Sequence, residues 1–422
     1  MNPMSAANTA DNPTTFTSYR LLRMTIVRSL VLLCAGIAVV AYLQYPQQPE
    51  PRVTFQSDLV RIQNAMAQLK PTEPKYAYLQ VQQAQLTGNF EDFYRANQLL
   101  AAFPDDRELV FLRAKVGLSM HDVAQGKNLY DKLSAYPNDT RTEDLAIDIA
   151  LQQGQYQPAV EMLTARLQRD AQWSDLARYA FLLHKFGDSK AADQLYAIAQ
   201  ERLSAKQIKD YAWLELQRGI IDLENGKHAD ALAHFELANR SYPGHWLIEE
   251  HLAETYALLN QPSKAIPLYQ QVIQQSDNPM YFFALGNLLK TTQPAQANEL
   301  FSTAEEKFQQ RYSRYPLAAS GHMMDIWIKE QERIPTDDRR ARLLQLSEMN
   351  LLYRPNADSI IQRIKVLIQE GDMLTAQQLT LALLATPWRT ADVTELANKF
   401  ELDLPALLPM QLPVDVLTNQ PL

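Results

Sequence analysis

Small and apolar residues recur along this chain at a nearly constant interval. The recurring positions are Phe93, Gly126, Ala159, Ala192, Ala231, Ala265, Ala297, Leu343 and Ala376. The gaps between them are 33, 33, 33, 39, 34, 32, 46 and 33 residues. A period near 34 in a chain with only 12 glycines predicts stacked helical hairpins, each too small to bury its own apolar face.

The clearest unit runs from Tyr211 to Tyr242 and shows why each residue type recurs. Its key positions, in order, are Gly219, Gly226, Ala231, Phe235, Ala238 and Pro243. The small residues let two antiparallel helices approach closely, the aromatic ring fills the space between hairpins, and the proline ends the second helix. Three further units keep this order: Ala253, Tyr256, Asn260, Ala265, Tyr269, Val272 and Pro279; Ala180, Gly187, Ala192, Tyr196 and Ala199; Ala284, Ala297, Phe301 and Ala304.

This order of small, aromatic and proline positions resembles the tetratricopeptide (TPR) repeat family. The resemblance implies an all-α, TPR-like superhelical solenoid of about nine hairpins over residues 76–400. Phe93 and Leu343 stand where the family prefers alanine, so we expect the outer repeats to be irregular. The 46-residue gap from Ala297 to Leu343 predicts an elongated hairpin.

One stretch near the N-terminus is apolar enough to cross a membrane. Residues 29–45 carry no charge, and seventeen residues give about 25 Å of helix, close to the roughly 30 Å of a bilayer core. Arg20, Arg23 and Arg28 precede this run and only Arg52 closely follows it, which places the N-terminus in the cytoplasm. We therefore predict a single-pass anchor over residues 20–45 in the inner (cytoplasmic) membrane of a bacterium, with the repeats on the periplasmic side.

A cleaved signal peptide is the alternative to an anchor, because a charged leader before a short apolar core also fits that description. The residues after the run, from Tyr42 to Pro46, contain no cleavage site of small residues, which favours the anchor. The chain's one cysteine, Cys34, lies in the same run. Thiolate metal sites and cysteine nucleophiles are therefore excluded from the rest of the chain.

The segments around the repeats have distinct compositions. Residues 1–19 are polar and predict a disordered cytoplasmic end, while residues 46–75 combine a proline-rich spacer with an amphipathic helix. The apolar stripe of that helix, within residues 53–69, fits either a cap on the first hairpin or a homodimeric coiled coil. Residues 401–422 form a proline-rich tail that cannot continue a helix, and it fits either a strap along the last repeat or a peptide for a partner.

Charge and motifs exclude several classes of function. A net charge of −8 argues against nucleic-acid binding, which needs lysines and arginines to neutralise phosphates. No P-loop, dinucleotide-binding, zinc-protease or serine-hydrolase motif occurs. His251 and Glu254 lie one helical turn apart but lack a second histidine partner, so we expect no metal, no cofactor and no catalytic residues.

The TPR resemblance also implies a concave face, built by the first helix of each hairpin, that holds a peptide or helix of another protein. Helical spacing places thirteen residues there: Glu108, Phe111, Lys115, Arg141, Asp144, Asp148, Phe181, Trp213, Leu216, Ile220, Glu250, Glu254 and Phe282. Phe181 and Trp213 are the expected anchors, although Trp213 fits equally well in the core of its own hairpin. The acidic character of this set predicts a basic or amphipathic partner.

These observations predict a non-enzymatic scaffold that binds another protein. The leading hypothesis is a membrane-anchored TPR adaptor that supports the assembly, biogenesis or secretion of an envelope complex. A cytoplasm-facing adaptor that regulates a membrane enzyme or protease is the second hypothesis, and an accessory subunit of an envelope enzyme is the third.

Overall fold

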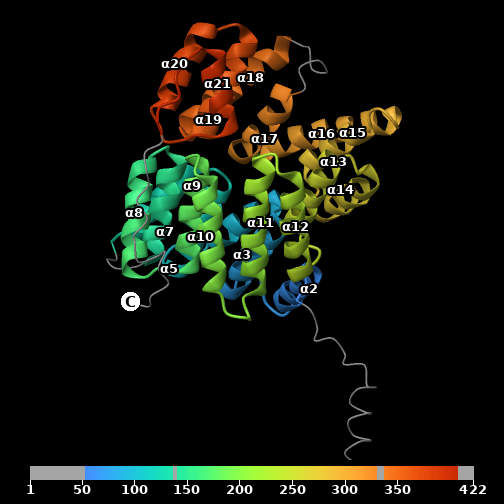
Figure 1. The fold of residues 1–422 in the computed structure, drawn as a ribbon. Coiled ribbons are helices and arrows are strands. Elements are labelled where there is room, and N and C mark those ends of the chain that lie inside the picture. The colour runs from blue at the N-terminus through green and yellow to red at the C-terminus, as the bar shows by residue number, and fades with distance from the viewer. Residues whose placement is uncertain (1–52, 136–139, 330–336, 407–422) are drawn as a thin grey trace, which may run out of the picture. The chain divides into compact units, whose positions relative to one another are not determined.

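The computed structural model of the protein describes residues 53–135, 140–329 and 337–406. Throughout these ranges the regular elements are helices (Figure 1). They are α2 (Phe55–Met66), α3 (Pro74–Thr87), α4 (Phe90–Leu100), α5 (Arg107–Ser119), α6 (Val123–Leu133), α7 (Thr140–Gln152), α8 (Tyr156–Arg169), α9 (Trp173–Lys185), α10 (Ser189–Glu201), α11 (Ile208–Glu224), α12 (His228–Ser241), α13 (Trp246–Leu258), α14 (Pro262–Ser276), α15 (Pro279–Leu289), α16 (Pro294–Arg314), α17 (Pro316–Lys329), α18 (Asp337–Tyr353), α19 (Ala357–Glu370), α20 (Met373–Leu384) and α21 (Ala391–Lys399).

The predicted membrane anchor at residues 20–45 lies outside the described residues, as do the N-terminal segment 1–19 and most of the C-terminal tail. None of the helices in the described ranges has the length and apolar character needed to cross a membrane.

Successive helices from α3 to α20 pack as antiparallel pairs, and together they form a TPR-like helical repeat. In the pair α11–α12, a Cβ on Gly219 would lie 2.4 Å from Cε1 of Phe235, so only glycine allows this approach. Gly286 and Phe301 repeat the arrangement in α15–α16, with 2.7 Å in place of 2.4 Å. The small and aromatic positions of the sequence period are therefore the contacts that close each hairpin.

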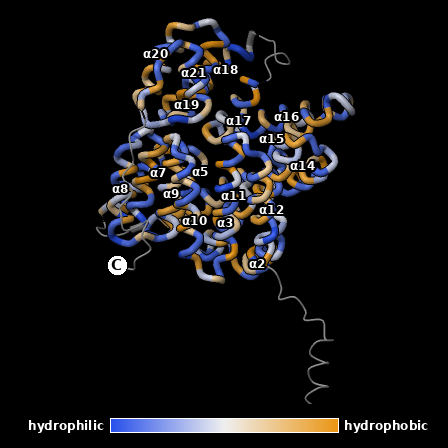
Figure 2. The backbone as a smooth tube through the Cα atoms, in the orientation of Figure 1, coloured by the Kyte–Doolittle hydropathy of each residue, from blue (hydrophilic) through white to orange (hydrophobic). Residues whose placement is uncertain are grey.

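Hydrophobic and hydrophilic residues are interspersed along the helices (Figure 2). Ala231, Phe235 and Ala238 on α12 are fully buried, at positions i, i+4 and i+7. The turn between α11 and α12 is made by Gly226 with φ +73°, a conformation that glycine adopts without steric cost. The polar faces remain outside the core, as the periodicity predicts.

The core is not spread along one dimension only, which differs from the expectation for a solenoid. The C-terminal helices α18–α21, drawn in orange to red in Figure 1, pack on helices some 200 residues earlier. Trp388 stacks on Tyr156 with ring centroids 4.9 Å apart, and the amide of Ala357 donates to the Tyr156 hydroxyl at 2.7 Å. The physical reason is that α7–α10 and α19–α21 each retain an apolar edge, and one buried cluster now covers both.

Helix α2 makes a similar long-range contact. Its Phe55 is 3% exposed and packs in one cluster with Phe235 and Tyr242, while its Ile62 packs against Leu79 of α3. The apolar stripe that could have formed a homodimeric coiled coil is therefore buried within the chain. The two alternatives for this stripe were a cap on the first hairpin and a homodimeric coiled coil. The structure shows packing within the chain, and this packing extends beyond the first hairpin to α11–α13.

Candidate functional site

A groove of about 850 Å³ opens between helices α2, α3, α5, α9, α11 and α13. Three of the residues expected on a concave face line it: Lys115, Trp213 and Leu216. Leu216 forms part of the floor and is only 1% exposed, because it packs in the same cluster as Phe235. The groove therefore combines a hydrophobic floor with a polar rim, as protein-binding surfaces commonly do.

Two tryptophans form the apolar wall of the groove. Trp213 of α11 is 40% exposed, and Trp173 at the start of α9 meets it edge to face with ring centroids 6.4 Å apart. Trp213 is therefore a surface residue and not a core residue of its hairpin. Sequence reasoning missed Trp173, although it precedes Ala192 by 19 residues and Trp213 precedes Ala231 by 18. The two tryptophans are thus one position out of register, and aligning the repeats would have matched Trp213 with Ser174, the neighbour of Trp173.

Helix α2 forms the opposite wall through a buried carboxylate. Asp58 accepts hydrogen bonds from Arg61 at 3.0 Å, Lys209 at 3.0 Å and the Tyr242 hydroxyl at 2.9 Å. Burial alone would raise the pKa of Asp58, but these three donors outweigh burial and lower it. The ionised carboxylate thereby ties α2 to α11 and to the residue that follows α12.

His245 lies behind the same wall in an apolar setting. Its ring meets Phe55 edge to face at 5.8 Å and lies 5.8 Å from Trp246 in a stacked arrangement. Its Nδ1 is buried and has no hydrogen-bond partner among the described residues. Burial lowers the pKa of His245 to about 4, so the ring is neutral at pH 7.

Most of the charged residues expected on the concave face pair with one another beside the groove. These residues, together with the side chains that pair with them, form what we call the ion-pair ladder; its members are Lys115, Asp148, Arg178, Asp144, Arg166 and Asp175, with Arg141 and Glu108 at its exposed end. Arg178 bridges Asp144 at 3.0 Å and Asp148 at 2.8 Å, and Arg166 reaches Asp175 at 2.9 Å. Lys115 pairs with Asp148 from the groove side, and Arg166 also pairs with Asp144.

The ladder overturns the prediction of an acidic concavity. Asp144 and Asp148 are neutralised by Arg166 and Arg178, which lie on the neighbouring helices α8 and α9. The prediction counted only the charges on one face of the first helix of each hairpin, and so left these two arginines out. At the end of the ladder, Arg141 pairs with Glu108 and lies over the ring of Phe111, 6.0 Å from its centroid. The inner face of α5, α7 and α9 is therefore internally compensated, and it offers little net charge to a partner.

The other expected residues lie apart from the groove. Phe181 is 38% exposed but meets Trp388 edge to face at 6.4 Å, in the contact between α9 and the C-terminal helices. Ile220 packs partly buried against the core cluster of α11 and α12. Phe282 lies under Lys307, whose Nζ is 5.4 Å from the ring centroid.

Glu250 and Glu254 on α13 form a separate small cluster with His251. Nδ1 of His251 lies 2.7 Å from a Glu250 carboxylate oxygen and 2.8 Å from the Leu247 carbonyl. Burial would lower the pKa of His251, but Glu250 outweighs burial and raises it to about 9. Within the described ranges no group of three or more His, Cys, Asp or Glu side chains is placed to hold a metal ion.

Comparison with known proteins shows distant similarities. No family model matches the chain. A curated Drosophila melanogaster protein described as a BBSome complex member BBS4 homolog is 22% identical over 195 residues, which is 45% of this chain and 39% of that protein. The chain thus aligns with well under half the length of this relative.

Two solved structures align over more of the chain. A human IFIT1 dimer with PPP-AAAA aligns with a TM-score of 0.42 and 12% identity, over 80% of this chain and 96% of that one. Yeast Tom70 aligns with a TM-score of 0.34 and 13% identity, over 82% of this chain and 91% of that one. At these levels of similarity no named family is assigned to the chain.

Proposed function

We propose that this chain is a membrane-anchored TPR-like scaffold that binds a segment of another protein in the groove beside Trp173 and Trp213. The bound segment is a peptide or an amphipathic helix that inserts an apolar side chain between the two indoles. The anchor is residues 20–45, and the partner is a component of an envelope complex that the scaffold helps to assemble or export.

One observation carries the binding proposal. Trp213 keeps 40% of its surface exposed on an inner face where the neighbouring charged side chains are compensated by one another. Exposed tryptophans at the centre of a groove are typical binding hot spots, and truncating one costs about 2 kcal/mol of binding free energy or more. Burial against a partner is the simplest reason for this chain to keep Trp213 exposed beside the partly buried Trp173.

The anchor and its direction rest on the sequence alone. The uncharged run at 29–45 and the arginines before it support a single pass with the repeats in the periplasm. The cytoplasm-facing adaptor remains the alternative, and cysteine accessibility distinguishes them. A cysteine that replaces exposed Ile208 would react with a membrane-impermeant maleimide after outer-membrane permeabilisation if the repeats are periplasmic, and only after lysis if they are cytoplasmic.

We also propose that the chain acts by binding and not by catalysis. No arrangement of nucleophile, base and orienting group can be assembled from the groove residues, and Asp58, Arg61, Lys115 and Lys209 are held in ion pairs. An accessory subunit of an envelope enzyme would use the same groove, so the partner's identity separates these hypotheses.

The direct test is affinity capture of the full chain from its native membrane, followed by identification of the bound protein. The control is Ile208→Ala, because Ile208 is on the same helix as Trp213 and is equally exposed at 43%, yet it does not line the groove. We expect Trp213→Ala to weaken binding by about thirtyfold, the equivalent of 2 kcal/mol, and Ile208→Ala to leave it unchanged.

Two results would count against the groove. Equal capture by wild type, Trp213→Ala and Trp173→Ala would place the partner elsewhere. A loss of capture with Ile208→Ala equal to that with Trp213→Ala would show that the effect belongs to helix α11 as a whole.

A further inference from the structure

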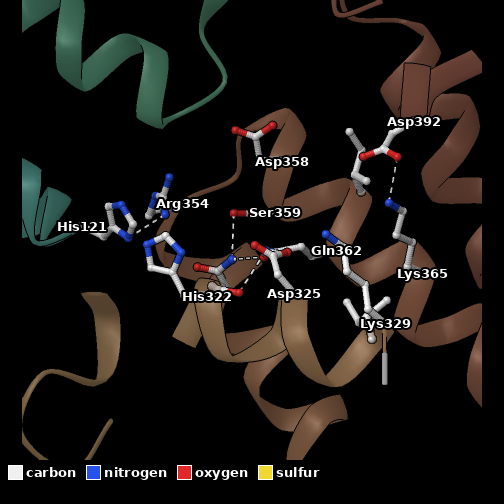
Figure 3. A pocket seen from close by; sticks show the side chains of 14 residues that line it. His121, His322, Asp325, Lys329, Arg354, Asp358, Ser359, Gln362, Lys365 and Asp392 are labelled. Atoms are coloured by element: carbon white, nitrogen blue, oxygen red, sulfur yellow. Dashed lines mark hydrogen bonds and ion pairs between the residues drawn. The ribbon is translucent and has the colours of Figure 1, made fainter. Parts of the chain in front are cut away.

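A second cavity, of about 430 Å³, lies away from the groove and joins three distant parts of the chain. His121 from the turn between α5 and α6, His322 from α17, and Arg354 just after α18 gather at one end of it (Figure 3). Lys365 and Asp392, which pair at 2.8 Å, lie at the other end. Asp325 and Asp358 also line the cavity.

Arg354 is held in place by a partner that does not neutralise it. Its Nη1 donates to Nδ1 of His121 at 2.8 Å, and since a guanidinium has no acceptor, His121 must be neutral at that nitrogen. The His121 ring also hydrogen-bonds to the backbone of Leu317, which fixes its orientation. Both bonds position the guanidinium at the cavity wall.

The charge of Arg354 has no carboxylate within 4.0 Å among the described residues, and its Nε is buried without a partner. Arg166, by contrast, is paired with Asp144 and Asp175. Arg354 is half-buried, and Asp358 acts on it electrostatically without forming an ion pair, so a ligand carboxylate would give the guanidinium the direct partner that it lacks.

Asp358 is the complementary group on the same cavity. It follows Arg354 by four residues, yet no described basic side chain lies within ion-pairing distance of its carboxylate. Figure 3 shows it near Ser359, with no interaction drawn to Arg354. Half-buried Arg354 and exposed Asp358 therefore line the same open cavity without pairing directly with each other.

We propose that this cavity binds a small zwitterion of the amino-acid class, with its carboxylate on Arg354 and its ammonium group on Asp358. The planar fork of a guanidinium matches a carboxylate through two parallel hydrogen bonds. Lysines and arginines balance the aspartates of the lining, with Arg354, Lys329 and Lys365 against Asp325, Asp358 and Asp392, so a zwitterion preserves neutrality. Phosphate would add negative charge beside two aspartates, which disfavours it.

The size of the cavity agrees with this class, because ligand sites of about 300 Å³ or more hold small molecules. The site is independent of the groove and requires no partner protein. It gives the scaffold a means to respond to a metabolite where the turn between α5 and α6 meets the helices from α17 onward.

The test measures thermal unfolding of the full chain in detergent with each of the common L-amino acids at millimolar concentration, and with the corresponding amino-acid amides. At least one free amino acid is expected to raise the Tm, while its amide, which lacks the carboxylate, is not. Arg354→Gln should fold, since it removes an uncompensated charge, and should weaken binding at least about tenfold.

Two further variants separate binding from folding. A side chain at Gly321 would enter the cavity, because a Cβ there meets nothing closer than Nε2 of Gln362 at 3.9 Å. Gly321→Leu should therefore fill the cavity and abolish the ligand-induced Tm rise. Arg218→Gln, which breaks a pair with Asp193 elsewhere, should lower the starting Tm but keep the ligand-induced rise.

Three results would overturn the proposal. They are an equal Tm rise with an amino acid and its amide, an undiminished rise in Arg354→Gln, and no rise with any amino acid. A rise with inorganic phosphate alone would likewise exclude the zwitterion and assign the site to a simple anion.

Discussion

The ion-pair ladder and the groove beside Trp173 and Trp213 are neighbours on the inner side of the repeats. They differ in how far their side chains are partnered within the chain. In the ladder, arginines bridge carboxylates from adjacent helices, and Asp175 is buried beside Arg166. In the groove, Trp213 is left 40% exposed, although polar side chains around Asp58 form the opposite wall. Lys115 belongs to both regions, since it lines the groove and pairs with Asp148.

This difference separates structural from functional use of one surface. A charge that is already compensated inside the chain gains little from a partner, because binding would have to replace existing pairs. Burying an exposed indole against a partner removes its apolar surface from water, and this burial contributes favourably to the binding free energy. The proposed binding surface is therefore narrower than the concave face as a whole.

The largest expected effect comes from breaking the ladder at Arg166. Its side chain is 14% exposed and that of Asp175 is 3% exposed, so Arg166→Gln leaves a buried carboxylate without its cation. We expect a loss of about 3 kcal/mol in the free energy of unfolding, measured by urea denaturation. Partner binding by the protein that remains folded should be unchanged. A loss below about 0.5 kcal/mol would show that the ladder is merely a surface feature.

The second effect is pH-dependent and tests the groove wall. Because the folded pKa of His245 is about 4, the unfolded chain binds a proton first as the pH falls below about 6.5, and stability declines down to about pH 4. The decline should reach about 2 kcal/mol at pH 5.

Urea denaturation at pH 7 and pH 5 measures this decline, with His245→Phe as the comparison because it keeps the aromatic contact but cannot ionise. The variant should lose correspondingly less stability on acidification than wild type. Equal losses in the two proteins would mean that His245 is not the buried neutral group described.

The smallest effect is expected at the exposed end of the ladder. The side chains of Arg141 and Glu108 are 36% and 50% exposed, so water can solvate either one if the other is removed. Arg141→Gln should change the free energy of unfolding by less than about 0.5 kcal/mol. A change as large as that of Arg166→Gln would show that exposure does not govern the ladder's energetics.

The repeat was predictable because its signal is local and periodic. Gly219 and Phe235 meet in one hairpin, and Gly286 and Phe301 make the same kind of contact in another, at a spacing of 15 residues in place of 16. Residues that let the two helices of a hairpin approach closely are needed in successive repeats, so such residues recur in the sequence with the repeat period. This periodic recurrence predicts the all-α hairpin architecture.

The contacts between distant repeats were not predictable in the same way. His121 and Arg354 are 233 residues apart, and Tyr156 and Trp388 are 232 apart, with no periodic relation that pairs them. The second cavity exists only because those segments meet. A sequence without an alignment gives no means of matching them.

The candidate groove was predictable from the sequence only in part. Trp213 was identified from helical spacing, whereas the neutralisation of Asp144 and Asp148 was missed because each helix was considered without its neighbours. Aligning successive repeats would have led only to Ser174, the neighbour of Trp173. It would not have found Asp58, which reaches Tyr242 from 184 residues away.

The most direct test of the account is photo-crosslinking in intact cells from single positions on the inner face. A photoreactive residue would replace Trp213 in the groove, Phe111 beside the ladder, or Ile208 on the same helix as Trp213. The account predicts one abundant protein adduct from position 213 and none from 111 or 208. Adducts from position 111 with none from 213 would contradict it, because the partner would then bind the compensated surface and not the tryptophans.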